Sequence, residues 1–329
     1  MNDRPAALNR RHLLALGASA AASSLPAFAQ PAWPSRPVRI VVPFSAGGAA
    51  DTSARAVGQR VGDVLGQPIT IDNRTGGNAV VAANAVLGAP RDGYTFIWDA
   101  ANQITNPVLL KDLPIDYRKD FVPVSMAVRA PQVLVVRHDF PAKTFAEFLA
   151  VARAKPGTIS VGTPPSGAMG HLAVALLQQR AGLQLLHTPY RGGADAARDV
   201  MGGQIDAALI TTATARGTVA SGKTRMLAVT SAQRLRAYPD IPTIAESGFP
   251  GYDMDDWFGL FAAAGTPEPI VRRMEAAVLQ ATRDPALAAS VEPAGFVVVG
   301  SSAKEFAAWI DGQRALLQKL IKDMHITIG

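Results

Sequence analysis

Cysteine is absent from the 329 residues of this chain. Its absence excludes disulfide bonds, thiolate nucleophiles, and metal or iron–sulfur sites built on cysteine. Histidine is nearly as scarce, and the histidines are too far apart in sequence for any pair to have the spacing typical of a metal site. We therefore expect neither a metal nor any other cofactor. The histidines are His12, His138, His171, His187 and His325.

Charged residues are also few, at 18% of the chain, and the net charge of +6 is not concentrated anywhere. Arg4, Arg10 and Arg11 against Asp3 account for +2 within residues 1–29, and the remaining +4 is spread along the chain. Nucleic-acid-binding proteins usually show a basic block or basic residues interleaved with aromatic ones. Neither pattern occurs, so we expect no nucleic-acid partner and a surface that attracts anions weakly.

The chain has no apolar stretch long enough to cross a membrane, but its start has the pattern of an export signal. Arg10 and Arg11 precede a short run rich in alanine and leucine, and Ala27 and Ala29 form an A-x-A cleavage site before Gln30. Adjacent arginines are typical of the twin-arginine route, which exports folded proteins. We expect residues 1–29 to be removed and the mature protein to be periplasmic and soluble.

The most informative stretch is a strand, a glycine-containing loop and a helix near the start of the mature chain. Residues 38–42 are largely apolar and β-branched, Gly47 and Gly48 follow, and a helix pattern runs over residues 49–65 with Asp51 in its first turn. The first amides of a helix lack intrahelical partners and its dipole favours negative charge, so such a loop can bind an anion. An ordinary strand-to-helix connection is the alternative for this stretch alone.

The same construction returns twice later in the chain. Residues 159–161 lead through loop 162–170 to a helix over 171–181, and residues 183–188 lead through 189–193 to a helix over 194–201. Strands alternating with helices predict an α/β fold, and glycine-rich loops after such strands place a ligand in a cleft. Further strands are expected at residues 69–72, 94–98, 132–136, 205–210, 226–230 and 257–263, further helices at 79–87, 145–154, 268–282 and 303–322, and irregular connections at 113–124 and 238–252.

Several short motifs together resemble one family. The first loop has the form Pro43-Phe44-x-x-Gly47-Gly48-x-x-Asp51. With other motifs that span nearly the whole mature chain, it is similar to the Bug family, the periplasmic binding receptors of tripartite tricarboxylate transporters. The other motifs are Asn106-Pro107, Asp120-Phe121-x-Pro123-Val124, Tyr190-Arg191-Gly192-Gly193, Gly203-Gln204-Ile205-Asp206, residues 240–248 and Trp257-x-Gly259-Leu260.

The resemblance implies a two-lobed, type II periplasmic-binding-protein fold of the α/β class, whose lobes close on a ligand in the cleft between them. It implies that residues 30–132 with 254–329 form lobe 1 and residues 133–253 form lobe 2. In the family, backbone amides, hydroxyls and ordered water hold the ligand carboxylate, from loops that match residues 44–51 and 163–171 here. It also implies a membrane permease of the tripartite tricarboxylate type as partner. We expect the receptor to be a monomer.

Departures from the family's pattern bear on the ligand. Ala79 stands in the second loop where glycine is common, and Pro164, Pro165 and Met169 stand where small polar residues are more usual. Each proline removes an amide donor, and methionine adds an adaptable apolar surface. We therefore expect a small mono- or dicarboxylate with an apolar or aromatic part.

Each candidate binding residue has a structural alternative. Asp51 can cap its helix as well as hold a water or a ligand donor, and Phe44 can be a core residue as well as a stacking wall. His171 begins a helix, where a positive charge is unfavourable, so we expect it to be neutral. The predicted binding residues are Phe44, Ser45, Ala46, Gly47, Gly48, Asp51, Thr163, Ser166, Gly167, Met169, Gly170, His171, Tyr190, Gly192 and Thr211.

We expect a binding protein rather than an enzyme. The chain contains no G-x-S-x-G elbow, P-loop, H-E-x-x-H or complete Rossmann fingerprint. Asp253, Asp255 and Asp256 are interpreted as a solvated turn, because no other metal ligands accompany them. An exported hydrolase with an unrecognised catalytic constellation is the alternative. A ligand-sensing regulator is disfavoured by the export signal and by the lack of a recognisable DNA-binding domain.

Overall fold

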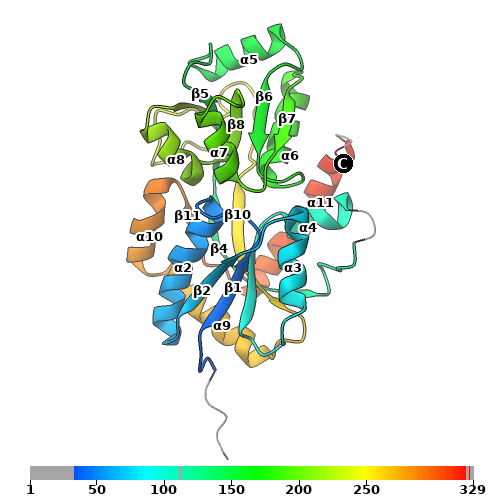
Figure 1. Ribbon diagram of the computed structural model, residues 1–329, viewed down its shortest axis with the longest axis vertical. Helices are drawn as coiled ribbons and strands as arrows, with labels where there is room; N and C mark the ends of the chain where they lie inside the picture. Colours follow the sequence, from blue (N-terminus) through cyan, green and yellow to red (C-terminus); the bar gives the residue numbers. More distant parts are fainter. Residues whose placement is uncertain (1–32, 111–112, 324–325, 327–329) are drawn as a thin grey trace, which may run out of the picture. The chain divides into compact units, whose positions relative to one another are not determined.

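The computed structural model describes residues 33–110, 113–323 and 326 (Figure 1). The predicted export signal at residues 1–29 lies outside these residues. Residues from Arg36 onward form one unit, which holds every helix and strand described below. The chain is a mixed α/β protein with two sheets, as the sequence predicts. None of the helices in the described ranges is both long and apolar enough to span a membrane.

The first sheet combines strands from both ends of the chain. Its strands are, in spatial order, β11 (Val297–Val298), β4 (Phe121–Ala130), β10 (Asp256–Ala263), β3 (Thr95–Asp99), β1 (Val38–Val42) and β2 (Ile69–Asn73). β1 is parallel to β2 and β3, whereas β10 runs antiparallel to β3 and β4. Every residue of β10 is buried, as expected for a central strand covered on both faces.

Helices lie on both sides of the first sheet (Figure 1). The helices on one side are α2 (Ala49–Leu65), α9 (Glu268–Thr282) and α10 (Pro285–Val291), which is followed by η2 (Glu292–Ala294). The helices on the other side are α3 (Val80–Leu87), which follows η1 (Gly77–Ala79), α4 (Asn102–Leu109) and α11 (Ala303–Asp323). α11 packs against the sheet through aromatic rings. Phe306 of α11 and Trp257 of β10 are almost fully buried, with ring centroids 5.4 Å apart.

The second sheet is built from the middle of the chain. Its strands are, in spatial order, β7 (Leu186–Pro189), β6 (Ser160–Thr163), β8 (Ala207–Thr211), β5 (Gln132–Arg137) and β9 (Thr224–Val229). β6 is parallel to β7 and β8, and β5 is antiparallel to β8 and β9. Its helices are α5 (Phe145–Ala154), α6 (Met169–Ala181), α7 (Gly193–Met201) and α8 (Thr212–Ala220). The parallel strands therefore end in the loops that lead to α6, α7 and α8.

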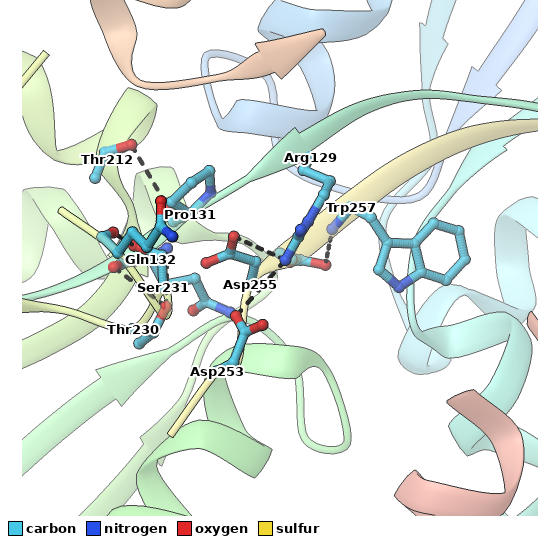
Figure 2. A network of polar contacts seen from close by, with 11 residues as sticks. Arg129, Pro131, Gln132, Thr212, Thr230, Ser231, Asp253, Asp255 and Trp257 are labelled. Carbon is cyan, nitrogen blue, oxygen red and sulfur yellow. Dashed lines mark hydrogen bonds and ion pairs between the residues drawn. The ribbon is translucent and has the colours of Figure 1, made fainter. Parts of the chain in front are cut away.

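The chain passes between the two sheets through residues held by a polar network (Figure 2). A single residue, Pro131, separates β4 from β5. Its carbonyl accepts hydrogen bonds from the Thr212 amide at 2.9 Å and from the Thr212 hydroxyl at 3.3 Å. On the return passage, the Met254 amide donates to the Thr230 carbonyl at 3.1 Å. Both passages are thus tied to the second sheet by backbone hydrogen bonds.

The predicted bounds of β1, α2, α5 and α9 are those observed. The irregular connection predicted for residues 113–124 is wrong at its end, because β4 begins at Phe121 and contains Pro123. The pairing of β4 with β10 shifts register beside Pro123, an irregularity that accommodates a residue without an amide hydrogen. Sequence reasoning also missed α4, which contains Pro107, and α8, which starts directly after β8.

Candidate functional site

The loop between β1 and α2 is folded around the carboxylate of Asp51. Gly47 has a φ of 77°, which glycine adopts without strain, and its amide donates to Asp51 Oδ2 at 3.0 Å. Arg55 Nε donates to the same oxygen at 3.0 Å. Burial raises the pKa of Asp51, but the hydrogen bonds from Arg55 and Gly47 outweigh it, so this pKa lies below its usual value. Asp51 is therefore ionised, and its charge is matched within its own helix.

In the second sheet, α7 and α8 begin close to the carboxyl ends of β7 and β8. Thr211 caps α8 by accepting a hydrogen bond from the Thr214 amide at 3.3 Å, and the two hydroxyl oxygens are 2.9 Å apart. Gly192 precedes α7 in an extended conformation. Asp195 lies in the first turn of α7, where an acidic residue is favoured. Its ion-pair partners are Arg191 at 3.4 Å and Arg198 at 3.0 Å.

These helix starts touch the β1–α2 loop. The Ser45 hydroxyl donates to Asp195 Oδ2 at 2.8 Å, and the Ala49 amide donates to the Thr214 hydroxyl at 3.1 Å. A Cβ atom on Gly192 would lie only 2.9 Å from the Ser45 amide nitrogen, so the approach depends on glycine at this position. The first turn of α2 from one sheet thus meets the first turns of α7 and α8 from the other.

A small cavity lies where these segments meet. Its volume is about 20 Å³, slightly more than one water molecule needs, so a carboxylate ligand does not fit in this arrangement. The helix starts around it carry partial positive charge, and hydroxyl groups and two aromatic rings complete its wall. The lining residues are Phe44, Ser45, Gly48, Ala49, Ala50, Pro164, Gly193, Thr211, Thr214, Asp256 and Phe258.

Two of the other, larger grooves are less suited to an anion. A groove of about 840 Å³ runs along β2 and the later turns of α2, away from the helix start that carries positive charge. Another, of about 470 Å³, is lined by Arg129, Arg234 and Arg236, and also by the acids Asp253, Asp255 and Glu292. Two of its three arginines are already engaged, because Arg129 is 3.0 Å from Asp255 and Arg234 is ion-paired with Glu246.

The β6–α6 loop is organised by two histidines. The rings of His171 and His187 stack with centroids 3.9 Å apart, and the Thr163 hydroxyl lies 2.7 Å from His187 Nε2. The Gly167 amide donates to His171 Nδ1 at 3.1 Å. Burial lowers the pKa of both histidines to about 4, so both are neutral at neutral pH, as the sequence predicts for His171. Thr163 is engaged within this cluster, and Pro164 is the residue of the loop that lines the cavity.

The structure divides the predicted binding residues into three groups. Four of them, Phe44, Ser45, Gly48 and Thr211, line the cavity. A second group contacts the lining residues or holds the first loop: Gly47, Asp51 and Gly192. The third group does not line it. Ala46 is exposed, and Tyr190 donates its hydroxyl hydrogen bond to Asp199. The others lie at the end of β6, in the loop after it or at the start of α6, and are absent from the lining: Thr163, Ser166, Gly167, Met169, Gly170 and His171.

The comparison with known families agrees with this arrangement. Residues 53–326 match the family described as "Tripartite tricarboxylate transporter family receptor", or TctC. The chain belongs to the TctC receptor family. The resemblance to Bug receptors seen in the sequence is thereby confirmed. The family and the fold are those of periplasmic binding proteins rather than of enzymes.

Individual TctC relatives align over nearly the whole chain. A UPF0065 protein from the tcbD-tcbE intergenic region of Pseudomonas sp. (strain P51) is 34% identical over 318 residues, covering 96% of this chain and 95% of the relative. The structure of the periplasmic binding protein BugD is 30% identical, with a TM-score of 0.85, and covers 90% of this chain and 99% of BugD. The structure of R. palustris Rpa4515 with adipate is 32% identical, with a TM-score of 0.86 and the same coverage.

Sequence reasoning missed several residues of the candidate site. Thr214 and Asp195 contact the first loop from helices far along the chain, and neither belongs to a motif that announces this contact. Asn78 also bridges the two sheets, because its side-chain amide donates to the Ser166 carbonyl at 2.9 Å. The sequence feature that could have indicated Asn78 is the loop Gly76-Gly77-Asn78. Asparagine tolerates a positive φ, and Asn78 has a φ of 50° here.

The acidic residues before β10 correct one expectation. The solvated turn predicted for Asp253, Asp255 and Asp256 is wrong for the last two. The side chain of Asp255 is 7% exposed, and Asp256 as a whole residue is 5% exposed. Figure 2 shows Arg129 between Asp253 and Asp255, at 3.6 Å and 3.0 Å. Burial raises the pKa of Asp255 and of Asp256 to about 7. Asp256 lines the cavity, so an acidic group belongs to the candidate site.

Proposed function

We propose that this chain is a periplasmic receptor that captures a small carboxylate between two lobes and delivers it to a membrane permease of the tripartite tricarboxylate type. Lobe 1 would comprise residues 30–132 and 254–329, and lobe 2 residues 133–253. The observation that carries the proposal is the meeting of the first turns of α2, α7 and α8 at one polar cavity. Helix starts favour anions, and here they come from both sheets.

Capture requires the lobes to move. In the described arrangement the cavity holds about 20 Å³, so the β1–α2 loop must separate from Gly192 and Thr214 before a ligand can enter. A ligand then stabilises the closed form only by the difference between its affinities for the closed and open forms. The Ser45 hydroxyl, the Ala49 amide and the α8 cap would supply donors to the carboxylate once their mutual contacts open.

The class of ligand is inferred from two sources. Phe44 and Phe258 line the cavity with ring centroids 6.2 Å apart, which provides an apolar wall for the body of the ligand. The related Rpa4515 structure is that of a protein with adipate, a carboxylate with an apolar chain. A mono- or dicarboxylate with an apolar or aromatic part fits both. We expect the receptor to act as a monomer and without turnover of the ligand.

Gly48→Val tests the site. A Cβ at this position would lie 3.3 Å from the Ser45 carbonyl oxygen and within 4 Å of Ala194, so a branched side chain crowds the meeting point of the two loops. Gly217→Val is the control, because a Cβ on this exposed α8 glycine has open space.

The measurement is the thermal shift of the mature protein, starting at residue 30, with di- and tricarboxylates, acidic amino acids, and benzoate- and nicotinate-like acids. We expect at least one acid to raise the Tm of the wild type and of Gly217→Val, but not of Gly48→Val, and to be recovered chemically unchanged. Turnover of the acid would favour the hydrolase alternative. A full shift in Gly48→Val would contradict the site assignment.

A further inference from the structure

We propose that Asp256 makes this receptor select a ligand that carries a positively charged hydrogen-bond donor near its carboxylate, that is, a zwitterionic aminocarboxylate. The inference rests on the proposed function, since it concerns the same cavity. It starts from a mismatch: a site formed by helix starts, which favours anions, contains a buried acid.

The position of Asp256 places it in the wall of the cavity. It is the first residue of β10 and pairs with Ala130 at the end of β4, where the chain crosses to the second sheet. Although it is only 5% exposed, it lines the cavity together with Phe258, two residues further along the same strand. Residues two apart on a strand share a face, which explains why both line the cavity.

Within the described residues, the Asp256 carboxylate has one protein hydrogen bond, accepted by Oδ1 from the Trp257 amide at 2.9 Å. The charged groups that act on it are Asp255 and Asp99, and both are acidic. Ionised Asp256 would therefore be a buried charge without a cation, which proteins usually avoid.

Three other acids around the site have arginine partners, whereas buried Asp99 accepts hydrogen bonds from the Ala100 amide and the Gln103 side chain. Asp51 is 2.8 Å from Arg55, and Asp255 is 3.0 Å from Arg129. Asp195 has two, Arg191 and Arg198. The chain thus provides a cation for each of these three carboxylates but leaves Asp256 without an ion pair among the described residues. A cation supplied by the ligand would complete the same pattern.

The remaining wall of the cavity suits a ligand with both charges. The starts of α2, α7 and α8 and the hydroxyls of Thr211 and Thr214 are suited to a carboxylate. Phe44 and Phe258, beside Asp256 in the lining, provide aromatic rings that are compatible with an ammonium group. A ligand with carboxylates alone would place like charges in one small cavity, unless Asp256 took up a proton.

The experiment compares acids that differ by one ammonium group. Calorimetric titration of the mature protein uses succinate against L-aspartate, glutarate against L-glutamate, and adipate against 2-aminoadipate. In at least one pair we expect the amino acid to bind the wild type about 10- to 100-fold more tightly, the range expected for a hydrogen bond between charged groups. This comparison requires no variant, so it does not depend on how a mutant folds.

Two variants assign the preference to Asp256. Asp256→Asn keeps the size of the side chain and removes its charge, and we expect it to bind both members of the pair with similar affinity. Asp253→Asn removes the same charge from a side chain that is 46% exposed and does not line the cavity, and we expect it to keep the preference. Circular dichroism spectra and unfolding curves confirm that each variant is folded.

The outcomes separate the two proposals. If plain acids bind the wild type as tightly as their amino partners, or if the preference survives in Asp256→Asn, the inference about Asp256 is wrong while carboxylate capture stands. Tighter binding of the plain acids by Asp256→Asn, without any preference for the amino acids in the wild type, would show a protonated Asp256 acting on the carboxylate instead. If no member of any pair binds the wild type, the inference about Asp256 fails, whereas carboxylate capture is decided by the wider thermal-shift panel.

Discussion

Replacing Gly192 with alanine should force the two sheets' loops apart. Gly192 has a φ of −176°, extended backbone that alanine adopts equally well, so the change introduces no backbone strain. An added Cβ would lie 2.8 Å from Ser45 Oγ, 2.9 Å from Ser45 N and 3.1 Å from Ser45 Cβ. Rotation of the serine side chain relieves the contact with Oγ but not the contact with the backbone nitrogen.

The size of the effect follows from the neighbouring contacts. Because non-bonded heavy atoms settle at about 3.5–4 Å, the loops must separate by roughly 0.5–1 Å. The Ser45–Asp195 and Ala49–Thr214 hydrogen bonds, at 2.8 Å and 3.1 Å, would then be stretched or broken. At about 0.5–1.5 kcal/mol each, their loss weakens the described arrangement of the loops by about 1–3 kcal/mol, or about 5- to 150-fold in population.

Distance measurements between two labels report this population directly. The chain has no cysteine, so cysteines introduced at exposed Gln59 of α2 and Gln179 of α6 are the only thiols to carry spin labels. We expect a shift toward longer distances in Gly192→Ala. Gly193→Ala is the matched control, because its Cβ would be 3.4 Å from Thr214 Cγ2, close to an ordinary contact. Identical distance distributions in wild type, control and Gly192→Ala would refute the reasoning.

Two further predictions concern stability. In Gly259→Ala, the new Cβ would lie 2.4 Å from the ring of buried Phe306, so we expect a loss of about 1–3 kcal/mol in denaturant unfolding; an unchanged midpoint would contradict this packing. In the folded protein the pKa of His171 and of His187 is lowered from 6.5 to about 4, so as the pH falls the unfolded chain binds protons at these histidines before the folded chain does. Their contribution to the free energy of unfolding is therefore complete above pH 6.5 and is lost as the pH falls toward 4. Buried Asp99, whose pKa is raised to about 7, acts in the opposite sense. The test is therefore the difference between wild type and the double variant His171→Gln/His187→Gln, which should narrow between pH 6.5 and 4; a constant difference would show that the histidines do not contribute.

Local signals in the sequence account for the elements that were predicted with correct bounds. The strand at residues 38–42 and the helix that follows are separated by Pro43 and two glycines, which act on the backbone directly. The start of α5 is marked by Thr144, whose hydroxyl accepts a hydrogen bond from the Glu147 amide at 3.2 Å. In each case the deciding residues lie within one turn of the boundary.

Elements set by tertiary contacts were not predictable in this way. Pro123 and Pro107 both argue against regular structure, yet β4 is held by pairing with β10 over its length and α4 by packing against α11. The same limit applies to the site. Ser45 and the helix start of α2 were predicted from their own loop, whereas the partner of Ser45 lies 150 residues further along the chain. The placement of the two sheets determines which helix start meets which loop. A local sequence pattern does not encode this placement.

The contacts between the loops also indicate which hydrogen bonds a bound ligand would replace. The carboxylate of Asp195 accepts from Ser45, and the hydroxyl of Thr214 accepts from Ala49, so both donors already bind oxygen atoms in the described arrangement. A ligand carboxylate would replace these oxygens with its own. Asp195 would lose little, because two arginines remain beside it. Such an exchange conserves the number of hydrogen bonds and contributes little discrimination between acids. Among the described residues that line the cavity, Asp256 is the acidic one, and no ion pair within the described residues engages it. We therefore expect selectivity between acids to depend on Asp256.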